Sequence, residues 1–216
     1  MKYKAIIFDL DGTLLDTLRD LTDSVNKSLR HFGFPPHSRE VFKYFIGDGR
    51  DTMVRRALPP EHRDDTTLNR VVKYVDKEYD KHWADNTRPY DGIPELLDAL
   101  ILNNYKIAVL SNKPHSFTET MVAKLLSRWH FEAIAGALPS VPIKPDPTSA
   151  LKIAQELNIK PVDFLYLGDS DIDMKTATRA KMFPVGALWG FRTAEELKAG
   201  GAKALIKHPK ELLTLL

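Results

Sequence analysis

Short apolar runs and amphipathic stretches alternate along much of the chain. The apolar runs are rich in β-branched and aromatic residues, which is typical of buried strands, and they span residues 5–8, 107–110, 164–167 and 183–185. Apolar residues at helical spacing predict helices over residues 93–102, 116–126, 148–157 and 172–180. This alternation predicts an α/β fold in which a parallel sheet carries helices on both faces.

Residues 16–89 follow a different pattern. No convincing strand is found there, and amphipathic stretches over 18–32 and 68–83 predict helices, with shorter ones between them. Because this segment lies between the first two strand-like runs, we expect an all-helical insertion (16–89) in an α/β domain made of residues 1–15 and 90–216. Residues 209–216 are expected to form a short amphipathic helix that closes the domain.

Composition narrows the class of protein. The chain has 216 residues, is 43% hydrophobic and 28% charged, and has no cysteine, which excludes disulfides, thiolate metal sites and cysteine nucleophiles. A net charge of +2 without a basic block argues against a nucleic-acid surface. No apolar run approaches the roughly 20 residues needed to cross a bilayer, and no signal peptide is evident. We expect a cytoplasmic monomer or homodimer with no membrane or nucleic-acid partner.

Four polar clusters follow a strand-like run or precede a helix. They are residues 9–13 (DLDGT), 111–112 (SN), 144–147 (KPDP) and 168–173 (GDSDID). Taken singly, each could be a solvated turn, a helix cap or a surface charge. In a parallel sheet, however, the carboxyl ends of the strands lie at one edge, where ligands commonly bind. We therefore predict that these clusters meet around one crevice.

Such a crevice would gather several carboxylates. Carboxylates crowded together repel one another and need a cation, and oxygen ligands favour a hard ion such as Mg²⁺. Phosphate oxygens commonly fill the remaining coordination positions of that ion. Lys144, Ser111, Thr13 and backbone N–H groups could supply the other donors to a phosphoryl group.

The ordered set Asp9, Ser111, Lys144 and Asp169 resembles the haloacid dehalogenase superfamily of phosphotransferases. Within it, the phosphoglycolate phosphatase-like group is most similar, through the segments DGTLLDT, FIGDGR, PYDGIPELL, SNKP, KPDP and LGDSDID. The resemblance implies a doubly wound, Rossmann-like core and identifies the helical insertion as a cap domain.

The resemblance also implies two catalytic carboxylates. Asp9 would be the nucleophile that forms an aspartyl-phosphate, and it is ionised at neutral pH when unperturbed. Asp11 would protonate the leaving alcohol oxygen and then activate the water that hydrolyses the intermediate. The main-chain carbonyl of Asp11 is expected on the metal.

Further roles follow for the other motifs. Lys144 would neutralise negative charge on the phosphoryl group and on Asp9. Ser111, Asn112 and Thr13 would bind phosphoryl oxygens. Asp169 would bind Mg²⁺ directly, as would Asp9, whereas Asp173 would bind it directly, bind it through water, or orient Lys144.

Substrate selection is expected on the cap. Arg50 follows a glycine-bracketed turn and could bind a substrate carboxylate, although a plain interhelical loop with a solvated arginine would have the same sequence. The segment Trp189-Gly190-Phe191 follows the last expected core strand and could flank the site, but packing is the preferred interpretation.

These features predict a Mg²⁺-dependent phosphatase for a small phosphorylated metabolite, with 2-phosphoglycolate as the candidate substrate. The alternative is a sugar phosphomutase similar to β-phosphoglucomutase, which would share the catalytic set. A true dehalogenase or a phosphonatase is disfavoured because Asp11 is present. A phospho-aspartate signalling module is disfavoured because such modules are smaller, and the helical insertion has no role in them.

Overall fold

The computed structural model describes residues 3–216. The chain divides into two compact units, one made of the residues up to Leu15 together with Pro89–Leu216 and the other made of Asp16–Arg88. Among residues 3–216, no helix has both the length and the apolar character required to cross a membrane.

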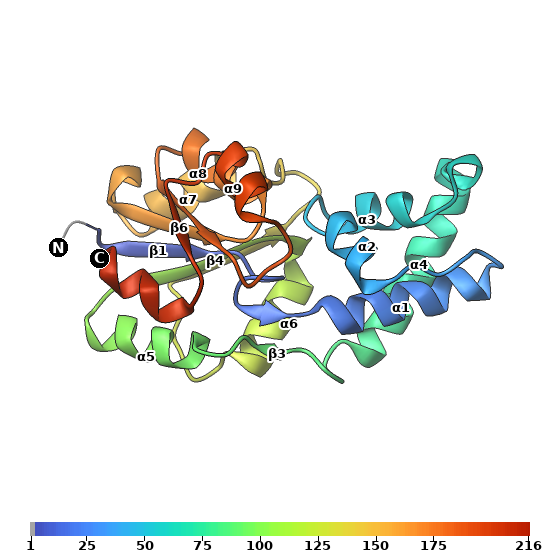
Figure 1. Cartoon of the computed structure of the whole chain (residues 1–216), viewed down its shortest axis with the longest axis horizontal. Coiled ribbons are helices and arrows are strands. Elements are labelled where there is room, and N and C mark those ends of the chain that lie inside the picture. The colour runs from blue at the N-terminus through green and yellow to red at the C-terminus, as the bar shows by residue number, and fades with distance from the viewer. Residues whose placement is uncertain (1–2) are drawn as a thin grey trace. The chain divides into compact units, whose positions relative to one another are not determined.

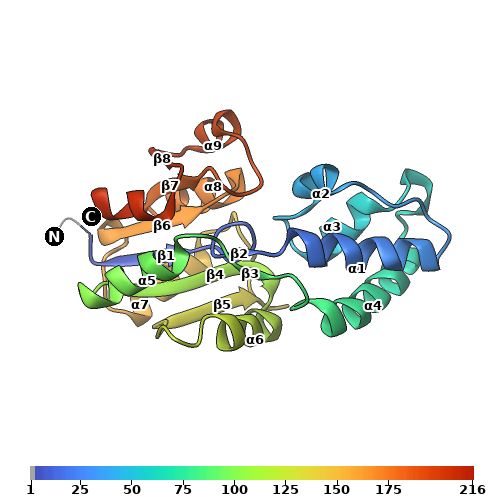
Figure 2. The ribbon, with the colours of Figure 1, turned by 60° about the horizontal axis from the view of Figure 1, so that its bottom comes forward.

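The first unit contains a six-stranded sheet (Figure 1), and its strand order, β5-β4-β1-β6-β7-β8, can be followed in Figure 2. All neighbouring strands run parallel, which confirms the predicted α/β fold class. The strands are β1 (Ala5–Phe8), β4 (Lys106–Pro114), β5 (Ala133–Ala137), β6 (Phe164–Gly168), β7 (Phe183–Ala187) and β8 (Ala204–Ile206). All four residues of β1 are fully buried, as expected for a central parallel strand covered on both faces.

Helices cover both faces of this sheet. Alternate residues of β1 and β6, such as Ile7 and Tyr166, pack against α7 and α8 in one apolar cluster, whereas α5 lies on the other side of β1 (Figures 1 and 2). The helices of the unit are α5 (Ile93–Leu102), α6 (His115–Leu125), α7 (Thr148–Glu156), α8 (Asp171–Arg179) and α9 (Ala194–Gly200). The first four lie within one residue of the predicted ranges, because each has a clear apolar face.

Three elements of the first unit differ from the sequence prediction. Strand β5 has the sequence AIAGA, which carries little bulk, and β8 has only three residues, so neither produced a clear apolar run. The C-terminal element is a 3₁₀-helix over Pro209–Thr214 rather than an amphipathic helix over 209–216. Short elements of this kind take their conformation from packing more than from local pattern.

The second unit is helical. It contains α1 (Leu18–His31), α2 (Arg39–Phe45), α3 (Arg50–Ala57), α4 (Asp65–His82) and a 3₁₀-helix (Pro60–His62). Contrary to the expectation of no strand, β2 (Leu15–Asp16) and β3 (Arg88–Pro89) form a two-stranded sheet. These two-residue strands are too short to show an alternating pattern.

A buried carboxylate fastens the two ends of the second unit together. Asp20 on α1 is 2% exposed. It accepts hydrogen bonds of 2.8–2.9 Å from the backbone and side chains of Asn86 and Thr87. Because these donors satisfy a buried charge, Asp20 fixes the start of the insertion to its end.

Candidate active site

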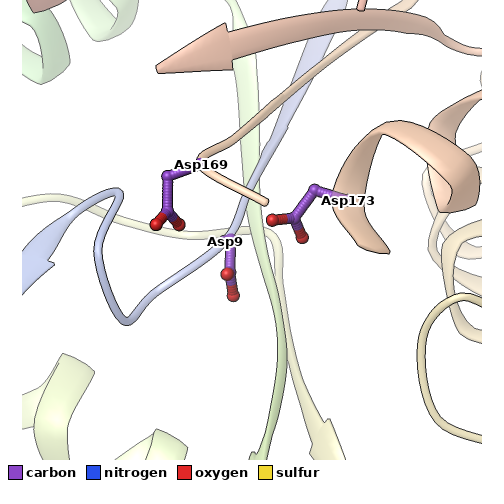
Figure 3. Close-up of side chains that lie close together, drawn as sticks. All are labelled: Asp9, Asp169 and Asp173. Carbon is purple, nitrogen blue, oxygen red and sulfur yellow. The ribbon is translucent and has the colours of Figure 1, made fainter. Parts of the chain in front are cut away.

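Three buried carboxylates converge at the carboxyl edge of the sheet (Figure 3). Asp9 directly follows β1, and the parallel register pairs Phe8 with Leu167, so the chain leaves β1 beside the end of β6. Asp169 follows β6, and Asp173 lies in the first turn of α8. One oxygen from each of these three residues lies within 4.8 Å of the other two.

Local sequence at the start of α8 fixes Asp173. The hydroxyl of Ser170 caps the helix by accepting from the backbone N–H of Asp173, and Asp173 Oδ2 accepts from the backbone N–H of Ser170 at 3.1 Å. Gly168 permits the close approach, because a Cβ there would lie 2.3 Å from the Asp173 Cβ. The motif thus needs a glycine for space and a capping box for orientation.

Lys144 lies between two of the carboxylates. Its ammonium is 2.8 Å from Asp9 Oδ1 and 2.7 Å from Asp173 Oδ1, and it donates to the carbonyl of Leu110 at 3.0 Å. Asn112 anchors the Lys144 backbone: its amide oxygen accepts from the Lys144 N–H at 2.8 Å, and its Nδ2 donates to the Lys144 carbonyl at 2.9 Å. These two bonds fix the backbone of Lys144 beside Asn112, although the two residues lie 32 positions apart in the chain.

Burial makes this cluster electrostatically costly. Burial is the main cause that raises the pKa of Asp9 well above its usual range, and the nearby Asp173 charge adds to it. The pKa of Asp169 is raised to about 7, again mainly by burial and then by Asp173. Burial disfavours the Lys144 ammonium, yet Asp173 and Asp9 raise its pKa well above its usual range. Lys144 thus pairs with two of the three carboxylates, and the Arg192 charge lowers the pKa of the third, Asp169, by less than burial and Asp173 raise it.

The donor set fits a hard divalent cation. All three side chains offer carboxylate oxygens, and a single ammonium cannot balance them. Asp9 Oδ1 accepts the Leu10 N–H and contacts Lys144, while among the described residues Oδ2 accepts no hydrogen bond. Within residues 3–216, each oxygen of Asp169 accepts only one hydrogen bond, from a neutral donor, so Asp169 and Asp9 are suited to hold the cation. Asp173 is less suited, because its Oδ1 pairs with the Lys144 ammonium and its Oδ2 accepts two bonds from Ser170.

A loop after β7 orients Asp169. Its two oxygens accept one hydrogen bond each, Oδ1 from the Thr13 hydroxyl at 3.0 Å and Oδ2 from the Phe191 N–H at 2.8 Å. The Trp189 indole donates to the Thr13 carbonyl at 3.0 Å. A Cβ on Gly190 would lie 2.2 Å from the Asp169 Cβ. These bonds connect three separate loops. Sequence analysis allows residues 189–191 to flank the site but does not predict these bonds, because the Phe191 donor is a backbone N–H without a side-chain signature and the indole bond depends on tertiary proximity.

The remaining predicted phosphate ligands lie at the same edge, but some of their groups are already engaged. Ser111 is 3% exposed, and its Oγ accepts from the Lys113 N–H at 3.2 Å. The Thr13 hydroxyl donates to Asp169. Phosphate binding by Ser111, Thr13 and Asn112 stays a prediction.

Two other predicted residues have clear partners. Asp11 Oδ1 lies 3.1 Å from the ammonium of Lys113, a residue to which sequence analysis assigned no role. Arg50, in the second unit, pairs with Asp76 at 2.7 Å and Asp51 at 2.8 Å. The substrate-binding role of Arg50 stays a prediction.

Comparison with known proteins identifies the family. The family model for haloacid dehalogenase-like hydrolases matches residues 6–187. The chain belongs to this family. It is 31% identical to a phosphoglycolate phosphatase of Chromobacterium violaceum, over 99% of this chain and 96% of the relative. It is 30% identical to an N-acetylmuramic acid 6-phosphate phosphatase of Pseudomonas aeruginosa, over 100% of this chain and 96% of the relative.

Solved structures of this hydrolase family share the architecture. A structure from Lactobacillus delbrueckii superposes with a TM-score of 0.92 at 31% identity, covering 98% of this chain and 97% of that one. A hydrolase from Pseudomonas syringae superposes with a TM-score of 0.78 at 25% identity, covering 98% and 96% of the two chains. The predicted superfamily and enzyme class are thus confirmed.

The raised pKa of Asp169 predicts how stability depends on pH without divalent metal. A carboxyl whose pKa is about 7 when folded and near 4 when unfolded stabilises the fold at low pH, and this contribution is lost as the pH rises through 7. In EDTA we expect Tm to fall by about 5–10 °C between pH 5 and pH 8. Added Mg²⁺ should raise Tm most at pH 8. Differential scanning calorimetry measures both effects.

Asp169→Asn is the control for this pH dependence. The amide keeps an acceptor for the Phe191 N–H but carries no charge, so the variant should be at least as stable as the wild type at pH 8 in EDTA. It should also gain little stability from Mg²⁺. A variant as sensitive to pH and Mg²⁺ as the wild type would show that Asp169 causes neither effect.

The hydrogen bond from Trp189 to Thr13 predicts a specific effect on metal use. Trp189→Phe keeps an aromatic ring but leaves the Thr13 carbonyl without this donor, at a cost of about 1 kcal/mol. We expect the Mg²⁺ concentration that gives half-maximal thermal stabilisation to rise about threefold or more. Trp129→Phe is the matched control, since it removes an indole bond to Asp98 elsewhere in the unit. Equal Mg²⁺ responses in the two variants would contradict a positioning role for Trp189.

Proposed function

We propose that this chain is a Mg²⁺-dependent phosphomonoesterase that acts through an aspartyl-phosphate on Asp9, with 2-phosphoglycolate as the candidate substrate. The observation that carries the proposal is the buried cluster of Asp9, Asp169 and Asp173 around the Lys144 ammonium. Its excess of negative charge needs a cation, and its position beyond the carboxyl ends of β1 and β6 suits a phosphate ester.

In the first step, a carboxylate oxygen of Asp9 attacks phosphorus while the bond from phosphorus to the ester oxygen breaks. Asp11 donates its proton to the departing oxygen, so the alcohol leaves neutral. In the second step, Asp11 takes a proton from water, and the water oxygen attacks phosphorus. The bond to Asp9 then breaks, which returns both carboxyl groups to their starting states and releases inorganic phosphate.

Charge control comes from the surrounding groups. Lys144 holds Asp9 Oδ1 at 2.8 Å and so orients the carboxylate that attacks phosphorus. When bound by Asp9 and Asp169, Mg²⁺ supplies positive charge that reduces repulsion between Asp9 and the phosphate dianion. Asp173 keeps Lys144 charged and oriented, so its role is positioning.

The relatives favour hydrolysis over mutase chemistry. The curated relatives from Chromobacterium violaceum and Pseudomonas aeruginosa are both named as phosphatases, and each aligns with nearly the whole of this chain. Their names differ in substrate, so the ester itself must be identified by assay. Phosphate release from 2-phosphoglycolate, N-acetylmuramic acid 6-phosphate, sugar phosphates and nucleotides would test the proposal. If the panel, which should include glucose 1-phosphate with a bisphosphate primer, showed isomerisation without release of phosphate, the phosphatase proposal would fail.

Asp9→Asn should abolish turnover because the amide is a poor nucleophile. We expect a decrease in kcat of at least about 10³-fold, with the far-UV circular dichroism unchanged. Asp171→Asn is the matched control: Asp171 lies in the same acidic motif but is bound to Lys175 on the surface, at 2.5 Å. Full activity in Asp9→Asn would refute covalent catalysis by this residue.

Asp11→Asn should separate the two steps. An amide cannot take the proton from water, so hydrolysis of the aspartyl-phosphate should slow by about 10²-fold or more. With an activated aryl phosphate, whose leaving group needs little protonation, a burst of phenol should precede slow turnover. Rapid-quench kinetics would measure the burst, and its absence together with an unchanged kcat would rule out Asp11 as the acid/base.

A further inference from the structure

Lys113 takes no part in the steps above, yet its ammonium lies in the site. Its Nζ is 3.1 Å from Asp11 Oδ1, and its side chain is only 6% exposed. A lysine on a protein surface usually keeps its ammonium in water, so burial of this one requires an explanation.

The structure holds Lys113 in place through its backbone. Its N–H donates to Ser111 Oγ at 3.2 Å, and its carbonyl accepts from the Thr118 hydroxyl at 3.3 Å. Gly136 of β5 packs against the same carbonyl, since a Cβ there would lie 2.8 Å from it. The ammonium also lies 5.8 Å from the centre of the Phe117 ring. A cation held this firmly loses little conformational freedom when it binds a ligand.

The position of Lys113 relates it to one part of the substrate. Asp11 donates its proton to the ester oxygen, so the leaving group must lie within hydrogen-bond distance of Asp11. Lys113, beside Asp11, therefore faces the leaving group, whereas Lys144 contacts Asp9 on the phosphoryl side. In 2-phosphoglycolate a single methylene separates the ester oxygen from the carboxylate, so the carboxylate remains within reach of the Lys113 ammonium.

The predicted carboxylate ligand, Arg50, has different surroundings. It makes ion pairs with Asp51 and Asp76, and its side chain is 36% exposed. Two carboxylates already offset its charge, and exposed ion pairs are screened by water. Lys113 lies in a drier environment, with its side chain 6% exposed, where a charged hydrogen bond contributes more.

We propose that Lys113 is a specificity-determining residue that binds a carboxylate carried by the leaving group. This inference rests on the proposed phosphatase function and names the substrate class: phosphate esters of short 2-hydroxy acids. Esters with a neutral leaving group of the same size lack the anion and should be hydrolysed less efficiently.

The wild-type enzyme provides the first test. The substrates are 2-phosphoglycolate, its amide and ethyl phosphate, which share a primary ester and differ in charge. We expect kcat/KM for 2-phosphoglycolate to exceed that for either neutral ester by about 10- to 100-fold, mostly through KM. Equal values for the three esters would overturn the inference without any variant.

Variants of Lys113 provide the second test. Lys113→Met removes the charge and keeps the length, and it should lower kcat/KM for 2-phosphoglycolate by about 10- to 100-fold but for ethyl phosphate by less than about threefold. Lys113→Arg should keep most of the preference for the carboxylate. Lys152→Met, on the exposed face of α7, is the matched control and should leave kcat/KM unchanged for both substrates.

The outcomes separate this inference from the proposed function. If the wild type hydrolyses all the esters and Lys113→Met lowers kcat/KM equally for each of them, Lys113 only positions Asp11. The phosphatase proposal would then stand. Failure of the wild type to hydrolyse any ester in Mg²⁺ would refute the proposed function and this inference together. If Lys113→Met fails to fold, as judged by its thermal melt, the inference is tested by the comparison of the three esters with the wild-type enzyme and by the substrate preference of Lys113→Arg.

Discussion

The structure depends on keeping like charges together in a buried place. Asp9, Asp169 and Asp173 each offer an oxygen within 4.8 Å of the others, and all three side chains are largely removed from water. Such an arrangement opposes folding unless positive charge or hydrogen bonds compensate it. Lys144 compensates part of the charge, and the rest defines a site for a cation. The features that make the cluster costly are therefore the ones that would bind Mg²⁺ and an anionic ester.

The sheet provides the rigidity that this cluster needs. Parallel pairing of β1 with β4 and β6 brings three chain segments to one edge in fixed register. Short backbone and side-chain bonds then join the loops, through Asn112 to the Lys144 backbone and through Thr13 and Phe191 to Asp169. Because these bonds orient each carboxylate before any ligand arrives, binding would need little rearrangement.

The parts that could be predicted from sequence are those with a strong local or chemical signal. The apolar run of β1 and the polar motif after it predicted a buried strand that is followed directly by candidate catalytic residues. The structure brings Asp9, Asp169 and Lys144 together at the edge of the sheet, as the sequence predicted. Strands β5 and β8 were missed because small residues and short length give no apolar run. The Phe191 N–H and the Trp189 indole were missed because their roles depend on tertiary proximity to Asp169 and Thr13. Lys113 received no role from sequence analysis, since sequence alone cannot show that it contacts Asp11.

The most direct test is a crystal structure grown with Mg²⁺ and beryllium fluoride, which mimics a phosphoryl group on aspartate. The account predicts a fluoroberyllate bonded to Asp9 and a single Mg²⁺ bound by Asp9 and Asp169, with Lys144 still in contact with Asp9. A cluster without cation or fluoroberyllate at saturating concentrations, or a fluoroberyllate bonded to a different carboxylate, would contradict it.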